Sequence, residues 1–587
     1  MPTLNWIGKD KIINHHQDVP FRVFNHKYSF SSKDGRRETE TKSGNKIIHG
    51  DNLEALKSLL PEYEGKIDII YIDPPYNTGK EKWRYTDNVS HPKIQKWINE
   101  VVGVEGEDLT RHDKWLCMMY PRIKLLHRLL KEDGLFFCSI DDYEHGNLKP
   151  MLDLIFGYNN FLNNIIWQRA FSPINTKKRF SANHDFIISY AKNKQLVELS
   201  LPRSSDADNR YSNPDNDPRG NWTSGDLTVG PVVESKLYKI KTPSGNIFTP
   251  PLGRCWVVDE NKYNELLADK RIWFGEHGDN MPRLKRFLSE VKDGMTPITV
   301  WLYSEVGHTQ EAKKEIKELF PKSKLPFETP KPTKLMEKIL SLKNNPNAII
   351  LDSFAGTGST GHAVLNLNKK DGGNRKFILV ELEDYIEEIT ATRIKKAING
   401  YEFKGKKKSI ISSYSINYSN IKNSTKIIEE FENLKINNEF EDVKIESENN
   451  QIIITGQKYY EEKTEGTGGE FDFYELGQPI FKDGVNLNEE IGEKKIREYI
   501  YYTETKQYLK REQSPESKYL LDTLNDTGYY FYYEKDRLTA LCLETLNIVS
   551  EKAEQYLIYA DHCLLDQEYM FAKNIIFKKI PRDIKRF

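Results

Sequence analysis

IDIIYIDPPY, residues 67 to 76, joins an apolar run to an abrupt corner. The run Ile67–Ile72 predicts a buried strand, and the two adjacent prolines, which have no backbone N–H, predict that it ends there. We expect Asp73 and the Pro74 carbonyl to accept hydrogen bonds from an exocyclic amine, while the Tyr76 ring stacks on the base that carries it. An ordinary Pro-Pro turn uses the same residue types, so this stretch alone leaves both interpretations open.

A second motif lies far downstream, where an apolar run at Ile349 enters the Gly-rich segment Phe354-Ala355-Gly356-Thr357-Gly358. The segment Thr360–Leu367 that follows is predicted to be helical. Glycines let a backbone turn tightly and approach a ligand closely. A further predicted strand, Lys376–Val380, ends in Glu381, whose carboxylate can bind ribose hydroxyls. By itself this strand–turn–helix unit is shared by many nucleotide-binding sheets.

Together the two motifs resemble those of the amino-methyltransferases that use S-adenosylmethionine (SAM). In that family a DPPY corner holds the target amine, so the resemblance assigns the catalytic role to Asp73, Pro74, Pro75 and Tyr76. DPPY precedes FxGxG here, with a long insert between, which is the order found in the circularly permuted beta group of DNA methyltransferases. Aspartate as the first residue of the corner favours adenine N6 over cytosine N4 as the target.

Two more stretches are similar to cofactor-binding segments of the family. Ile47–Asn52 resembles the strand that ends in an acidic residue for the cofactor adenine, and Lys331–Leu335 resembles the loop and helix that close over the methionine end. The resemblance therefore implies a SAM site made of Asp51, Asn52, Lys331, Pro332, Thr333, Asp352, Phe354, Ala355, Gly356, Gly358 and Glu381. Its acidic members come at or just after predicted strand ends, so we expect them to line one rim of a sheet.

Three further stretches are similar to the modification (Mod) subunit of type III restriction–modification systems: Tyr211–Trp222, Arg271–Gly275 and Tyr501–Thr505. The resemblance covers essentially the whole chain. It implies a site-specific DNA adenine-N6 methyltransferase that flips its target base out of double-stranded DNA. It also implies a homodimer and a docking surface for a separate restriction (Res) subunit. Two alternatives stay open, a cytosine-N4 methyltransferase and a non-catalytic DNA-recognition scaffold.

Alternating apolar runs and periodic segments predict an α/β fold with a doubly wound methyltransferase sheet. The expected strands are Lys46–His49, Ile67–Ile72, Leu135–Ile140, Asn164–Gln168, Asp185–Tyr190, Ala348–Leu351 and Lys376–Val380. A chain of 587 residues exceeds what one core usually supports. We expect an N-terminal arm (1–45), the DPPY half (46–194), an inserted target recognition domain (195–327), the SAM half (328–400) and an α+β C-terminal region for dimerisation and partner docking (401–587). Within the last, Leu538–Val549 predicts an amphipathic helix.

The net charge of −1 gives no overall preference for nucleic acid, so DNA contacts are expected from local clusters. The candidates are Lys177, Lys178, Arg179, Arg219, Trp222, Arg254, Arg283 and Arg286. The five cysteines lack CxxC spacing and no HExxH pattern occurs, so neither a disulfide framework nor a metal site is expected. We find no signal segment and no apolar run of membrane-spanning length, and we expect a soluble protein of the bacterial cytoplasm.

Overall fold

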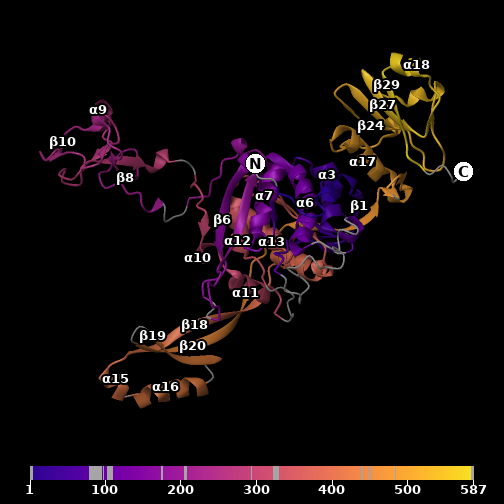
Figure 1. The fold of residues 1–587 in the computed structure, drawn as a ribbon. Helices are drawn as coiled ribbons and strands as arrows, with labels where there is room; N and C mark the ends of the chain where they lie inside the picture. Colours follow the sequence, from indigo (N-terminus) through magenta and orange to yellow (C-terminus); the bar gives the residue numbers. More distant parts are fainter. Residues whose placement is uncertain are drawn as a thin grey trace. The chain divides into compact units, whose positions relative to one another are not determined.

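The computed structural model describes residues 4–78, 96, 98–101, 110–173, 176–203, 208–291, 294–321, 329–422, 424–437, 440–448, 451–482 and 484–582. The chain divides into two compact units (Figure 1). The larger unit comprises residues 1–197, 298–340 and 345–587, and the smaller unit comprises residues 198–297 and 341–344.

The larger unit is built on an 11-stranded sheet. Its strands, in spatial order, are β15 (Val300–Trp301), β6 (Phe161–Gln168), β7 (His184–Ala191), β5 (Leu130–Ile140), β4 (Ile67–Ile72), β16 (Ile349–Asp352), β17 (Lys376–Glu381), β3 (Lys46–His49), β21 (Glu470–Pro479), β1 (Arg22–Ser31) and β2 (Gly35–Arg37). All seven predicted strands are present, at consecutive positions from β6 to β3. The strands from β5 to β3 are parallel, and β7 is antiparallel to its neighbours. The predicted α/β class is confirmed.

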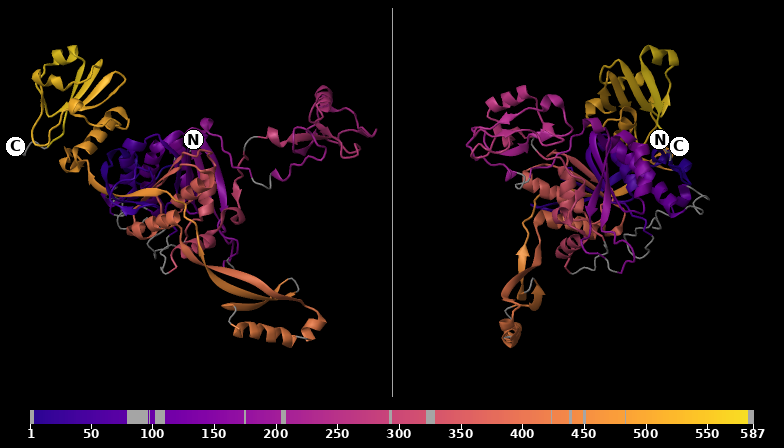
Figure 2. Two further views of the ribbon diagram at one scale, coloured as in Figure 1. Left: turned by 180° about the vertical axis from the view of Figure 1, so that it is seen from behind. Right: turned by 60° about the vertical axis from the view of Figure 1, so that its left-hand side comes forward.

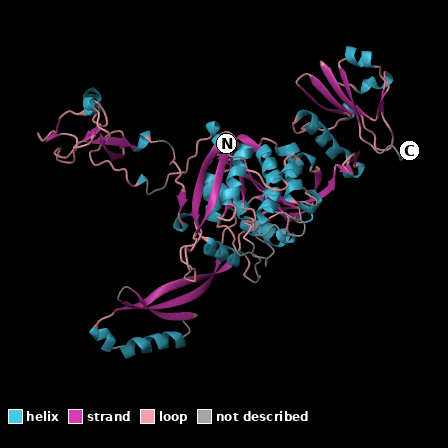
Figure 3. Ribbon diagram, in the orientation of Figure 1, coloured by secondary structure: helices cyan, strands magenta, loops and turns pink. Residues whose placement is uncertain are grey.

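Helices cover both faces of this sheet (Figure 3), and its central strand β4 is buried along its whole length. Ile70, Ile378 and Val380 share one core with α3 (Asn52–Tyr63), α6 (Arg111–Leu129) and α7 (His145–Phe156). Leu379 faces the other side of the sheet. A Cβ atom on Gly361 would lie 2.9 Å from the side chains of Leu379 and Ile394, so this close packing requires glycine. Three more helices of the larger unit are α12 (Thr333–Ser341), α13 (Ser359–Asp371) and α14 (Thr392–Asn399).

Four strands of the sheet were not expected from the sequence: β1, β2, β15 and β21. β21 pairs with β3 and with β1, so residues 470–479 and 22–31 extend a sheet otherwise formed by the middle of the chain. Asp472, inside β21, is 2% exposed and accepts hydrogen bonds from the hydroxyls of Ser29 at 2.5 Å and Thr41 at 2.8 Å. This buried carboxylate interrupts the apolar pattern by which a buried strand is recognised.

Two smaller assemblies follow in the sequence. The first is an antiparallel sheet of β18 (Glu402–Ser415), β20 (Gln451–Lys463) and β19 (Asp442–Glu448), on which α16 (Ser424–Ile436) packs through Ile427 (Figure 2). The second is a sheet of β24 (Leu520–Leu524), β25 (Thr527–Phe531), β27 (Gln555–Ala560) and β29 (Ile575–Lys579). The helix α17 (Glu493–Thr505) precedes this sheet in the chain, and α18 (Gln567–Ala572) comes between β27 and β29.

The predicted helix at Leu538–Val549 is wrong. This segment forms the short strand β26 (Ala540–Leu541) and a 3₁₀ helix, Glu544–Ile548. The Thr545 hydroxyl accepts from the Cys542 N–H at 2.8 Å and donates to the Ala540 carbonyl at 2.9 Å. Such local bonds from a threonine side chain to the backbone compete with helix formation.

The smaller unit contains short strands and the helix α9 (Glu260–Ala268). Its main sheet has the order β13 (Ile272–Trp273), β14 (Arg283–Phe287) and β8 (Trp222–Asp226). Its core is formed by Leu227, Ile240, Trp256, Tyr263, Ile272 and Phe274. The insert expected from the sequence ran to residue 327, but β15, α10 (Tyr303–Val306) and α11 (Thr309–Leu319) belong to the larger unit, because β15 pairs with β6.

Candidate functional site

Acidic residues follow the carboxyl ends of four neighbouring strands. In the order of the sheet, Asp73 follows β4, Asp352 ends β16, Glu381 ends β17, and Asp51 comes two residues after β3. Because these strands are parallel and adjacent, their carboxyl ends lie along one edge, which is where open α/β sheets bind ligands. The DPPY corner and the Gly-rich turn therefore lie at neighbouring strand ends.

Two hydrogen bonds join segments that are distant in the sequence. Lys331 Nζ donates to Asp73 Oδ2 at 2.6 Å, and Asn52 Nδ2 donates to the Ser353 carbonyl at 3.2 Å. The Lys331 ammonium also lies 5.1 Å from the centre of the Tyr76 ring. The resemblance assigned Lys331 to the cofactor, whereas its ammonium contacts the DPPY corner.

The DPPY corner is held by residues that were not predicted to belong to the site. Trp115, on α6, donates its indole N–H to the Pro75 carbonyl at 2.7 Å. Asn77 is fully buried with a φ of 59°, a left-handed conformation that asparagine tolerates well. Its side chain donates to Glu144 and, at 3.2 Å, to the Arg111 carbonyl. These contacts fix the corner at Pro75 and the residue that directly follows it, Asn77.

Asp73 Oδ1 and the Tyr76 hydroxyl are buried and make no hydrogen bond of good geometry among the residues that the structure describes, although the Tyr76 hydroxyl lies near the Asp73 carboxylate. Buried polar atoms are nearly always bonded, so an acceptor left open at the ligand-binding edge indicates a position for a donor from a ligand. Burial, and then the charge of Asp73, raise the pKa of Tyr76 well above its usual value. Tyr76 therefore stays neutral, with a ring suited to stacking.

The Gly-rich turn is shaped by two carboxylates. Glu381 accepts from the Gly356 N–H at 2.7 Å and also bonds the N–H groups of the two residues that follow it. Asp352 accepts from the Phe354 N–H at 3.1 Å and from the Thr360 hydroxyl at 2.5 Å. Burial raises the pKa of both carboxyls to about 7.

Glycine is required at two positions of this turn. Gly356 and Gly358 have φ values of 51° and 79°, and a Cβ atom on Gly358 would lie 3.2 Å from Thr390 Cγ2. The neighbouring Ser353 hydroxyl is buried without a partner in the described part of the chain. The turn thus combines close backbone approach with an unsatisfied polar atom. Its carboxylates suit ribose hydroxyls and a cationic ligand, so this half of the site fits SAM.

Asp51 and Asn52 are oriented by the start of α3. Asp51 is the N-cap of this helix and accepts from the Leu53 N–H at 2.8 Å. Its other oxygen lies 3.5 Å from Arg122, which is 2% exposed and donates to Asn52 Oδ1 at 2.5 Å. Both residues are therefore held rigidly at the edge of the sheet.

A buried guanidinium ties the Gly-rich turn to the loop that carries Lys331. Arg393, which is fully buried, donates to the hydroxyls of Thr357 at 3.0 Å and Thr333 at 2.8 Å, and it pairs with Glu315 at 3.4 Å. Thr357 lies in the turn, Thr333 follows Pro332, and Glu315 is on α11. Arg393 thereby fixes the position of one cofactor segment relative to the other.

Two further residues near the DPPY corner were missed by the sequence analysis. Trp167, on β6, is 1% exposed, and its ring centre lies 5.9 Å from Lys331 Nζ. Asp185, at the start of β7, pairs with Arg169 at 2.7 Å, and burial raises its pKa to about 6. In the sequence, Asp185 is marked only by its position as an acidic residue at the start of an apolar run.

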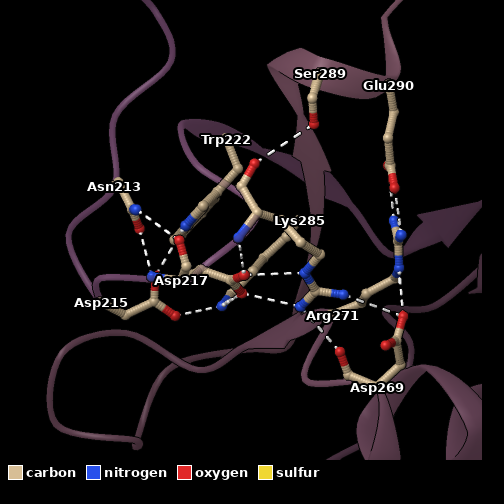
Figure 4. Close-up of polar contacts among 10 residues, drawn as sticks. Asn213, Asp215, Asp217, Trp222, Asp269, Arg271, Lys285, Ser289 and Glu290 are labelled. Atoms are coloured by element: carbon tan, nitrogen blue, oxygen red, sulfur yellow. Dashed lines mark hydrogen bonds and ion pairs between the residues drawn. The ribbon is translucent and has the colours of Figure 1, made fainter.

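In the smaller unit, the side chains of Arg219, Lys285 and Trp222 form hydrogen bonds with aspartates of the same unit (Figure 4). Arg219 makes two hydrogen bonds of 2.9 Å to Asp217, and Lys285, 3% exposed, bonds Asp217 at 2.9 Å. Trp222, a candidate for DNA contact, is 4% exposed and donates to Asp215 at 2.9 Å. These side chains hold the unit together, and the Trp222 ring is not presented at its surface.

The other DNA-contact candidates differ in how far they are engaged. Arg254 bonds the Thr228 hydroxyl at 3.0 Å, and Arg283 pairs with Asp226 at 3.0 Å. Exposed side chains are found at Lys177, Lys178, Arg179, Arg254, Arg283 and Arg286. Across the described ranges no group of three or more His, Cys, Asp or Glu residues could hold a metal ion. In the same ranges no helix is long and apolar enough to cross a membrane.

The comparison with protein families defines the class. A family model described as DNA methylase, of the N6/N4 type, matches residues 67–392, which is more than half of the chain. The match contains the DPPY corner, the Gly-rich turn and Glu381. The chain belongs to this family of DNA methylases.

Individual relatives include type III modification subunits, which confirms the predicted resemblance. The StyLTI Mod subunit of Salmonella typhimurium is 35% identical over 364 residues, 60% of this chain and 54% of that protein. The EcoP15I Mod subunit of Escherichia coli is 29% identical over 65% of this chain and 64% of that protein. The type II methyltransferase M.KpnI of Klebsiella pneumoniae is 31% identical over 57% of this chain and 80% of that protein. The chain thus spans 54% and 64% of the lengths of these two type III relatives.

Solved structures are more distantly similar. The M1.HpyAVI–SAM complex is 17% identical with a TM-score of 0.27, covering 59% of this chain and 98% of that chain. The PvuII DNA methyltransferase (cytosine-N4-specific) is 14% identical with a TM-score of 0.30, covering 60% and 86%.

Proposed function

We propose that this protein transfers a methyl group from SAM to N6 of a flipped-out adenine in double-stranded DNA, as the modification and recognition subunit of a type III restriction–modification system. The observation that carries the proposal is the position of Asp73. Its open Oδ1 lies at the end of β4, beside the strand whose Gly-rich turn fits SAM. Membership of the DNA methylase family and similarity to type III Mod subunits support the same activity.

Asp73 and the Pro74 carbonyl act on the nitrogen of the target amine. The lone pair of an adenine N6 is delocalised into the ring, so this nitrogen is a poor nucleophile. Accepting both N–H groups makes it more tetrahedral and localises the lone pair, and the Asp73 carboxylate meets the positive charge that develops. SAM, when bound, supplies the electrophilic methyl group. The fixed corner holds the amine in line for the displacement.

Pro75 and Tyr76 complete the proposed base pocket. Flipping the base out of the duplex costs a few kcal/mol, and stacking on an aromatic ring returns about 1–3 kcal/mol. The hydrogen bond from Trp115 to the Pro75 carbonyl keeps the corner in place while the base enters. Tyr76 offers its ring face to the base.

The direct test is transfer of label from tritiated SAM to duplex DNA, followed by digestion to nucleosides. Label in N6-methyladenine supports the proposal, and label in N4-methylcytosine supports the cytosine alternative. A protein that binds SAM and DNA but transfers no label is the DNA-recognition scaffold. Methylation-sensitive sequencing of DNA from cells that express the protein then identifies the recognised sequence.

The proposal extends to assembly and location: a homodimer, a separate Res subunit and the bacterial cytoplasm. Similarity to proteins named as Mod subunits of type III enzymes supports the separate partner subunit, while the homodimer and the location follow from the family resemblance alone. Light scattering of the purified chain measures the number of copies. Co-purification with a co-expressed type III Res subunit tests the docking surface.

SAM affinity is expected to fall as the pH drops through about 7. Burial raises the pKa of Asp352 and Glu381 to about 7, so both lose their negative charge below it, and SAM carries a positive sulfonium. Each of the two carboxyls that takes up a proton raises the Kd by up to about tenfold between about pH 8 and about pH 6. Equilibrium dialysis with tritiated SAM measures this effect. Glu381→Gln should flatten the profile, and a Kd that does not change with pH contradicts the assignment.

Arg286→Ala is expected to weaken DNA binding and to reduce the slope of log Kd against log salt by about 1, because Arg286 is exposed and free to contact a phosphate. Arg219→Ala is the matched control. Its guanidinium is engaged by Asp217, so this variant should destabilise the smaller unit and leave the salt slope of the folded protein unchanged. Titrations of duplex DNA at several salt concentrations measure both. Equal slopes for wild type and Arg286→Ala contradict the contact.

A further inference from the structure

The Lys331 side chain is built into the DPPY corner. It is 6% exposed, and its ammonium donates to Asp73 Oδ2 at 2.6 Å, a short charge-assisted bond. The ring centres of Tyr76 and Trp167 lie 5.1 and 5.9 Å from Nζ, within the range over which aromatic faces attract a cation. A lysine held by a carboxylate and two aromatic rings serves the base side of the site.

Two other acidic side chains lie close to Asp73. The charge of Asp73 acts on Asp185 and Asp352, both of them buried carboxyls, so the three acids repel one another. The titratable or charged groups that face Asp73 are Tyr71, Tyr76, Cys138, Asp185, Lys331 and Asp352. Of these, Lys331 supplies the positive charge. An ammonium beside a carboxylate favours the charged form, which presents only acceptors to an amine.

The two oxygens of Asp73 are used differently. Oδ2 is bonded to Lys331, while Oδ1 is buried with no partner among the described residues. A carboxylate fixed through one oxygen cannot rotate freely, so the other oxygen keeps one direction. Lys331 itself is held in place, because Thr333, two residues on, is bonded by Arg393 and Glu315.

We propose that Lys331 is a positioning residue for Asp73, holding Oδ2 so that Oδ1 faces the target amine as an ionised acceptor. The inference rests on the proposed methyl transfer for its purpose, but the ion pair is testable without it. Lys331 comes from the segment that the resemblance assigned to the cofactor, so the loop links the cofactor half of the site to the base half.

The ion pair is tested first by acetylation of lysines in the full-length chain, with peptides quantified by mass spectrometry. Lys331 should react roughly tenfold more slowly than Lys334, whose side chain is 58% exposed. In Asp73→Asn, which removes the charge but keeps the shape, Lys331 should react several-fold faster while Lys334 is unchanged. Equal reactivity of Lys331 in the wild type and in Asp73→Asn overturns the inference.

The purpose is tested with Lys331→Met and Lys331→Arg. In Lys331→Met, SAM binding should stay within roughly threefold of wild type, while single-turnover transfer near neutral pH falls by roughly tenfold or more. Lys331→Arg, which keeps the positive charge, should restore the wild-type rate of transfer. Lys334→Met, in which the exposed neighbour is changed, should behave as wild type.

The outcomes separate the two proposals. A loss of SAM affinity equal to the loss of rate would return Lys331 to the cofactor site and overturn the inference. A Lys331→Arg variant that transfers as slowly as Lys331→Met would also overturn it, since the positive charge beside Asp73 would then have no effect. A wild-type protein whose Lys331 is protected by Asp73 but which methylates no DNA refutes the proposed function and leaves the ion pair standing.

Discussion

Replacing Asp73 with alanine is expected to lower single-turnover methyl transfer to DNA by roughly 100- to 1,000-fold. The variant loses the acceptor for the amine and the negative charge that meets the developing cation. SAM binding should remain within roughly threefold of wild type, because the cofactor turn is shaped by Asp352 and Glu381. Rapid-quench measurement with tritiated SAM and duplex DNA gives the rate, and equilibrium dialysis gives the affinity.

Asp73→Ala also leaves Lys331 buried without its partner, and breaking a buried pair from one side can cost about 3 kcal/mol or more. The double variant Asp73→Ala/Lys331→Met removes both charges and is the matched control. It should recover thermal stability while transfer stays lost. If either variant methylates DNA at the wild-type rate, Asp73 does not have the catalytic role proposed for it.

Replacing Arg393 with methionine should have the largest effect on stability. Arg393 is fully buried and bonds Thr357, Thr333 and Glu315, so its removal leaves the Glu315 carboxylate without its cationic partner and two hydroxyls without this donor. We expect a loss of about 3–5 kcal/mol in the free energy of unfolding of the larger unit. SAM affinity should fall with it, because the turn and the Lys331 loop are no longer tied together. Denaturant unfolding and SAM dialysis measure the two effects.

Lys395→Met is the matched control for Arg393→Met, since it removes a cation from the same helix, α14. Lys395 pairs with Glu387 at 3.1 Å near the surface, so its loss should cost no more than about 1 kcal/mol. Arg393→Lys keeps the charge but not the planar fork, and it should recover only part of the stability. Equal stability of Arg393→Met and Lys395→Met would mean that the buried network does not hold the site together.

The links between the two halves of the site could not be read from the sequence. The bond between Lys331 and Asp73 spans 258 positions, and that between Asn52 and Ser353 spans 301. A local pattern records neither. The sequence analysis placed Lys331 with the cofactor because its neighbours resemble a cofactor loop, whereas the fold brings its ammonium to the base side.

Burial was equally hidden for polar and aromatic residues. Trp222 was expected to be a candidate for DNA contact, yet it packs against Trp273 and is 4% exposed. A tryptophan in a loop-rich segment looks the same in sequence whether it is exposed or buried. Asp472 is the opposite case, a charged residue that is buried. Its charge argues against a buried strand in the sequence, but in the fold the hydroxyls of Ser29 and Thr41 donate to its carboxylate.

The amino-acid sequence alone determined the seven central strands, their acidic ends and the two rigid turns, because strand propensity, proline corners and glycine turns depend on residues close along the chain. Only the tertiary structure decided which strand lies beside which, that β1 and β21 extend the sheet, and that Lys331 holds Asp73. Those features depend on contacts between residues hundreds of positions apart, whose energies appear only once the chain has folded.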